Sequence, residues 1–140
     1  MKDYIIVTDS GCDLSKEMVE SLGVKVVPMQ LMIDGQNYRH YHDCRELSMD
    51  DFYAKIRAGY IGQTSCVSIG DVMDTMREVL EEGKDVLYLS FSSGMSGSYN
   101  SALQAADALK EEYPESQIYV VDTLSGSVGL GMITYLASKR

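Results

Sequence analysis

The chain has 140 residues, of which 12 are basic and 21 acidic, so its formal net charge is −9. This length fits one domain with a core of its own. The charge argues against nucleic acid or an anionic membrane surface as partner, because both require a basic patch. The N-terminal apolar run is too short for a signal peptide, and no run approaches the ~18 apolar residues of a membrane span.

The first half of the chain alternates between strand and helix patterns. Residues 4–7 predict a buried strand, and a helix capped by Asp13 or Ser15 should end at Gly23. Val24 to Ile33 predicts a second strand, with Pro28 marking an edge or an irregularity. Asp34-Gly35 is typical of a hairpin turn, although Gln36 to Leu47 is polar and we expect it to be irregular.

The second half repeats the alternation. Ser48 and Ser68 each stand three residues before an aspartate, which predicts two helix starts of the capping-box type, with a loop over residues 62–68 between the two helices. A strand over 85–89, a helix over 99–112, a strand over 117–121 and a last helical pattern over 124–140 follow. Gly126, Gly129 and Gly131 in that last pattern indicate close approach of the backbone to another segment.

This order predicts an α/β fold with three layers, α/β/α, around a mainly parallel sheet. In such sheets ligands bind beyond the carboxyl ends of the strands. Polar loops follow three of the predicted strands, at residues 8–10, 92–98 and 122–123. We therefore expect these loops to share one rim, which the 63–65 loop can join.

The loop Phe91-Ser92-Ser93-Gly94-Met95-Ser96-Gly97-Ser98 lies between a strand and a helix start. Its hydroxyls, with the unpaired N–H groups at the start of a helix, can bind a carboxylate or a phosphate. The simpler interpretation is that these small residues turn the chain and cap the helix.

In these segments the chain resembles the N-terminal domain of the DegV family of fatty-acid-binding proteins. The similar stretches run through nearly the whole chain in the family's order: Val7-Thr8-Asp9-Ser10, Gly23 to Pro28, Asp51-Phe52-Tyr53, Thr64-Ser65, Ser92 to Ala102, and Val120 to Thr123. The departures are Cys66 and Val67, where the family usually has Gln and Pro, and a longer, more aromatic segment from Arg39 to Cys44. Family members usually carry a second domain that covers the acyl chain.

The resemblance implies a carrier without enzymatic activity that binds a long-chain, palmitate-like fatty acid. The carboxylate would be held by Thr64, Ser96 and Ser93, while Ser65 and Ser92 would support the loop. It further implies a cytoplasmic protein that presents the acyl group to a fatty acid kinase. Residues 1–140 would form one lipid-binding domain with no cofactor, exposing an apolar face for the second domain and self-associating through it when alone.

Three other interpretations stay open at this level. Asp9 follows the first strand, where phosphotransferases place a nucleophile, so a small phosphohydrolase or phosphotransferase is the alternative function. His40-Tyr41-His42-Asp43-Cys44 contains metal-ligand residue types, although an exposed loop explains it as well. Among the methionines, Met29, Met32 and Met95 are candidates to line an apolar tunnel, whereas Met73 and Met76 fit a helix core.

Overall fold

The computed structural model describes residues 3–140. A parallel sheet is formed by β1 (Tyr4–Asp9), β2 (Lys25–Val27), β6 (Asp85–Ser90) and β7 (Ile118–Asp122), in the order β2-β1-β6-β7. The helices around it are α1 (Lys16–Leu22), α3 (Ile69–Glu81), α4 (Ser98–Glu112) and α5 (Ser127–Ser138). A short 3-10 helix, η1 (Ser10–Cys12), follows β1.

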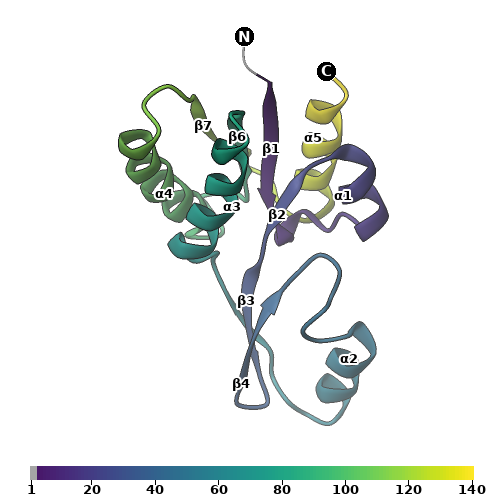
Figure 1. Ribbon diagram of the computed structural model, residues 1–140. Helices are drawn as coiled ribbons and strands as arrows, with labels where there is room; N and C mark the ends of the chain where they lie inside the picture. Colours follow the sequence, from purple (N-terminus) through teal and green to yellow (C-terminus); the bar gives the residue numbers. More distant parts are fainter. Residues whose placement is uncertain (1–2) are drawn as a thin grey trace.

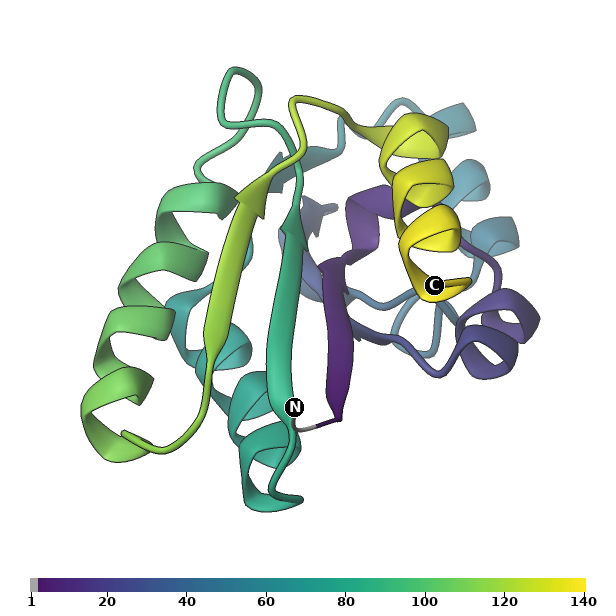
Figure 2. The same ribbon diagram turned by 90° about the horizontal axis from the view of Figure 1, so that it is seen from above.

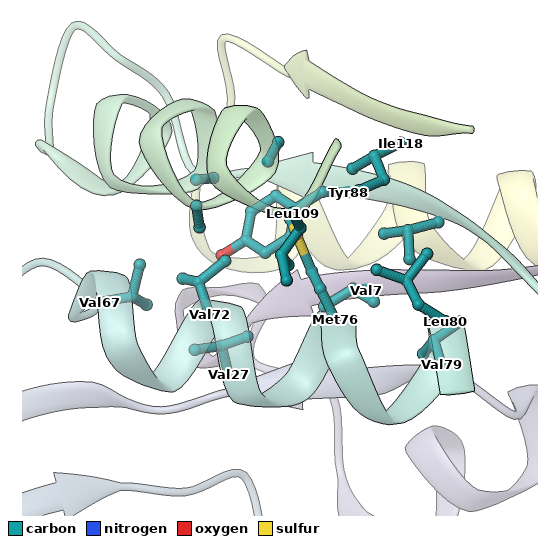
Figure 3. Close-up of a cluster of buried hydrophobic side chains, with 14 residues drawn as sticks. Val7, Val27, Val67, Val72, Met76, Val79, Leu80, Tyr88, Leu109 and Ile118 are labelled. Carbon is teal, nitrogen blue, oxygen red and sulfur yellow. The ribbon is translucent and has the colours of Figure 1, made fainter. Parts of the chain in front are cut away.

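Two apolar clusters fill the space between the parallel sheet and the helices on its two faces. The side chains of α3 and α4 pack on one face of the sheet with Val7 and Tyr88 (Figure 3) and with Val86. On the other face α1 and α5 pack over Ile6 and Leu89, and Figure 2 shows α4 and α5 on opposite sides of the sheet. The predicted α/β class with three layers and a mainly parallel sheet is therefore confirmed.

A second, smaller sheet extends the molecule beyond the carboxyl edge of the first (Figure 1). It contains β3 (Met29–Ile33), β4 (Gln36–His40) and β5 (Gln63–Ser65), in the antiparallel order β4-β3-β5. Helix α2 (Met49–Arg57) connects β4 to β5 and contains no buried residue. This small sheet was not predicted as a separate unit.

Three boundaries differ from the sequence prediction. The single strand expected from Val24 to Ile33 is divided at Pro28, so that β2 belongs to the parallel sheet and β3 to the small one. The expectation of irregular structure from residue 36 was wrong for residues 36–40, which form β4. The loop expected over 62–68 was wrong for residues 63–65, because β5 pairs with β3.

The helix starts follow the predicted local chemistry. Ser15, Ser48 and Ser68 each accept a hydrogen bond from the backbone N–H three residues later, and so cap α1, α2 and α3. Gly23 ends α1 with a φ of 63°, in the left-handed region. Such contacts lie within one turn of chain, which is why the sequence alone can predict them.

Glycines bring α5 close to its neighbours. A Cβ atom at Gly131 would lie 2.4 Å from the carbonyl oxygen of Cys12, and one at Gly126 would lie 2.5 Å from the Phe91 ring. At Gly129 the nearest atom would be 3.6 Å away, which is ordinary contact. Close approach is therefore confirmed for Gly126 and Gly131 and wrong for Gly129.

Candidate functional site

The three polar loops meet at the carboxyl edge of the parallel sheet, as predicted. The N–H of Phe91 donates to the Asp9 carboxylate over 2.9 Å, which joins the loops after β1 and β6. The N–H of Ser93 donates to Asp122 over 3.1 Å, and the Thr123 hydroxyl donates to the carbonyl of Ser90 over 2.7 Å. These bonds fix the rim on which a ligand can rest.

Asp9 organises this rim from inside the protein. Its side chain is fully buried, and its two oxygens accept from the N–H groups of Phe91 and Gly11. Burial raises the pKa of Asp9 to about 6, although the two N–H donors oppose the rise. A nucleophilic carboxylate must reach its substrate, and this one is covered with both oxygens engaged, so the geometry does not favour phosphotransfer.

Two of the predicted serines are occupied in holding the loop. The Ser92 carbonyl accepts from the N–H groups of Met95 and Ser96, and its hydroxyl accepts from the N–H of Gly94. The hydroxyl of Ser93 also bonds to Asp122, which lowers the pKa of that carboxyl. Ser92 therefore shapes the loop through these contacts, whereas Ser93 faces an acidic partner.

Ser96 lies at the start of α4. Its hydroxyl accepts from the N–H of Ser98 and lies 2.9 Å from the Ser98 hydroxyl. Gly97 is the N-cap residue and provides no side-chain bond. Within residues 3–140, the N–H groups of Tyr99 and Asn100 have no hydrogen-bond partner. This helix start therefore presents free donors and the positive end of a dipole.

Thr64 and Ser65 lie on β5, and both are exposed. In the described part of the chain, neither hydroxyl has a hydrogen-bond partner, so both remain free to bind a ligand. The segment that follows reaches α4, because the N–H of Val67 donates to the Ser98 hydroxyl over 3.4 Å. A Cβ atom at Gly97 would lie 3.4 Å from the sulfur of Cys66. Thr64 is thus linked to the serine loop through two residues of chain.

A cavity of about 240 Å³ opens beside Thr64, between the small sheet and α2. Thr64 is exposed and also lines this cavity, so it lies at the opening. Most of the wall is apolar or aromatic and includes Leu31, Tyr38, Leu47, Met49 and Phe52. Of the five predicted site residues only Thr64 lines it, and the four serines lie outside.

Two other cavities suit a fatty acid less well. The larger, about 440 Å³, lies between α1, β2 and α3 and is crossed by charged pairs, among them Lys25 with Glu78 at 2.7 Å. The other, about 310 Å³, is mostly apolar and lies between α1 and α5. Neither is lined by Thr64, Ser65 or a serine of the 92–98 loop.

The segment from His40 to Cys44 begins at the end of β4 and contacts the loop after β1. The Nδ1 atom of His40 lies 3.4 Å from the Ser10 hydroxyl, and His40 belongs to β4. His42 lines the 440 Å³ cavity, where burial lowers its pKa. Among residues 3–140, no three side chains of His, Cys, Asp or Glu are arranged to hold a metal ion.

Sequence reasoning missed most of the cavity wall. Tyr38 and His40 were assigned to irregular chain, and Leu47, Met49 and Phe52 were given no role in binding. Asp34-Gly35 was the available signal, because both residues have positive φ, 55° and 67°, as a two-residue hairpin turn requires. A hairpin there pairs Leu31 with Tyr38 and so predicts that both face the same side of the sheet. Of the methionines proposed for a tunnel, none lines this cavity, and Met76 is core as predicted.

Comparison with known proteins agrees with this architecture. A family model described as "Uncharacterised protein, DegV family" matches residues 4–139. A DegV domain-containing protein of Clostridium perfringens is 38% identical over 139 residues, which are 99% of this chain and 47% of that protein. The chain therefore belongs to the DegV family, and it spans about half the length of the curated relatives that it matches.

Two solved structures have the same fold. A stearic acid-binding protein of Eubacterium ventriosum superposes with a TM-score of 0.88 at 32% identity, over 97% of this chain and 46% of that one. A DegV family protein of Thermus thermophilus, described by its fatty acid binding, gives a TM-score of 0.82 at 36% identity, over 99% of this chain and 47% of that one. In this chain, no helix of residues 3–140 is long and apolar enough to cross a bilayer.

Proposed function

We propose that this chain binds a long-chain fatty acid and carries it without chemical change. The observation that carries the proposal is the free hydroxyl of Thr64 at the opening of a mostly apolar cavity, two residues before a segment that contacts the start of α4. The stearic acid named for one structural relative and the fatty acid binding named for another support the same ligand class.

The carboxylate would rest between β5 and the start of α4. Thr64 and Ser96 offer hydroxyls, and the free N–H groups of Tyr99 and Asn100 add donors at the positive end of the helix. Ser65 is a further free donor next to Thr64, while Ser92 and Ser93 hold the loop in shape. A carboxylate is charged at neutral pH, and each hydrogen bond to it contributes roughly 1.5–3 kcal/mol.

The acyl tail would enter the cavity beside Thr64. Burying each CH₂ group gains ~0.8 kcal/mol, so the tail supplies most of the affinity and the hydroxyls orient the headgroup. The net charge of −9 opposes a free anion at long range, which makes the local donors necessary. A fatty acid kinase as the receiver of the bound acid follows from the family resemblance and belongs to the same proposal.

Replacing Thr64 by valine tests the headgroup site. The change keeps the shape of the side chain and removes the hydroxyl, so palmitate should bind roughly 10- to 100-fold more weakly, the loss of one charge-assisted bond. Isothermal titration of the purified chain with palmitate measures this, and mass spectrometry of the same sample detects acid that copurifies.

Thr75→Val is the matched control. Thr75 lies on α3, and its hydroxyl donates to the Asp71 carbonyl, away from the proposed site. It should bind palmitate like the unchanged protein. If the unchanged chain binds no palmitate and contains none, the carrier function is wrong; if both valine variants bind equally, the headgroup assignment is wrong.

A further inference from the structure

The aromatic ring of Phe52 forms part of the wall of the cavity beside Thr64, next to Gly62. The register pairs Leu31 with Thr64 and Met32 with Gln63, so Gly62 lies beyond Thr64 on the side away from α4. A Cβ atom at Gly62 would lie 3.6 Å from the Phe52 ring and 3.6 Å from Leu31. Phe52 therefore reaches from α2 to the beginning of β5 and forms the cavity wall on that side.

The size of the cavity gives it a limited capacity. A dry apolar cavity of about 150 Å³ holds one benzene, or roughly 25 Å³ per carbon. By this measure the cavity of about 240 Å³ holds about ten carbons. A longer acid fills it and leaves its remaining carbons between Thr64 and Ser96 or in water.

The position of Phe52 makes it the adjustable part of the wall. It is half-buried, and α2 has no buried residue, so the helix can tolerate a smaller side chain there. Its neighbour Tyr53 packs edge-on against it, with 5.3 Å between ring centroids, but is 49% exposed and does not line the cavity. The two adjacent aromatic residues therefore differ in whether they line the cavity: Phe52 does and Tyr53 does not. Figure 1 shows their helix, α2, beside the small sheet.

We propose that Phe52 sets the length of acyl chain that this protein accommodates, an inference that rests on the proposed fatty acid binding. Each CH₂ group that enters the cavity tightens binding about fourfold. The gain should stop at the chain length whose terminal methyl reaches Phe52. Replacing Phe52 by alanine removes a ring the size of benzene and makes room for up to about six more carbons.

The test is a series of saturated fatty acids of increasing length, titrated into the unchanged chain and three variants. Below the length limit, the Kd should fall about fourfold per carbon for every protein. In Phe52→Ala the fall should continue for at least two carbons beyond the limit of the unchanged chain. Phe52→Leu, which keeps an apolar side chain in the helix, should give a smaller shift in the same direction.

Tyr53→Ala is the matched control and should keep the original limit. Thermal unfolding of each variant checks that it is folded, and Phe52→Leu keeps the test decisive if the alanine variant is not. The inference is wrong if the Phe52 variants keep the limit of the unchanged chain, or if Tyr53→Ala shifts it equally. Absence of binding for every acid would instead overturn the proposed function.

Discussion

At the scale of single residues, Asp9 connects the rim of the site to the stability of the fold. Its pKa is about 6 in the folded protein against 3.8 for the ordinary side chain, chiefly because of burial. The folded state therefore binds a proton more tightly than the unfolded state does. It follows that Asp9 contributes stability below pH 4, and that this contribution is lost as the pH rises to about 6.

Unfolding in urea between pH 4 and pH 7 should reveal this contribution. One pKa unit corresponds to about 1.4 kcal/mol, so the loss is about 3 kcal/mol for Asp9. Asp9→Asn removes the titration, so the free energy of unfolding of the unchanged protein, relative to that of Asp9→Asn, should fall by roughly 2–3 kcal/mol from pH 4 to pH 7. Carboxyls with a lowered pKa, such as the half-buried Asp34 and the exposed Glu112, change stability in the opposite sense, but they are present in both proteins. A difference that stays constant with pH would contradict the role given to burial.

At the scale of elements, α5 can approach η1 only through a glycine. At Gly131 an added Cβ would lie 2.4 Å from a backbone oxygen, which cannot move as a flexible side chain can. Gly131→Ala should therefore destabilise the protein by roughly 1–3 kcal/mol, as overpacking does. Urea unfolding followed by circular dichroism measures the change.

Gly129→Ala provides the comparison within the same helix. Gly129 is exposed, and its added Cβ would make only ordinary contact with Ser125. Alanine is the better helix former, so this variant should be more stable by roughly 0.5–1 kcal/mol. Equal effects of the two alanines would show that contact with η1 does not determine the choice of glycine.

The elements also show which parts of the fold can be predicted from sequence. The caps Ser48 and Ser68 were predicted, and Ser15 was one of the two candidates for α1, because each contact lies within four residues of chain. The strands β4 and β5 were not, because their sequences are polar and they are strands only through pairing with β3. A strand cannot be predicted from its own composition where pairing with another strand, rather than its own residues, stabilises it.

The candidate site also has one part that can be predicted from sequence and one part that cannot. The serine loop could be predicted because a strand, small residues and a helix start follow one another along the chain. The cavity could not, since Leu31, Tyr38, Leu47, Phe52 and Thr64 come from separate segments that only the folded small sheet brings together. To predict this cavity from the sequence, one would need to know how β3 pairs with β4 and β5.

At the scale of the whole molecule, α5 leaves an apolar face uncovered. Leu124, Val128, Met132 and Leu136 are 75%, 68%, 62% and 59% exposed, and the mostly apolar cavity of about 310 Å³ lies beside them. Contiguous apolar surface of this kind promotes association. We therefore expect the chain to bind a hydrophobic dye and to self-associate at high concentration.

Met132→Glu should weaken both effects, since it places a charge in the middle of this face. Sedimentation velocity over a range of concentrations, together with dye fluorescence, provides the measurement. Ala108→Glu adds the same charge at an exposed position of α4 and should leave both unchanged. A chain that remains monomeric and binds no dye would contradict this prediction.

Pro28 separates the parallel sheet from the segment that forms the small sheet. Residues 29–65, which build the small sheet and α2, are inserted in the crossover that leads from β2 through α3 to β6. The pairings of the parallel sheet, β1 with β2 and β6 and β6 with β7, include none of these residues. The cavity beside Thr64 can therefore diverge in evolution without altering the parallel sheet, as long as Pro28 and the residues around Val67 keep the junction intact.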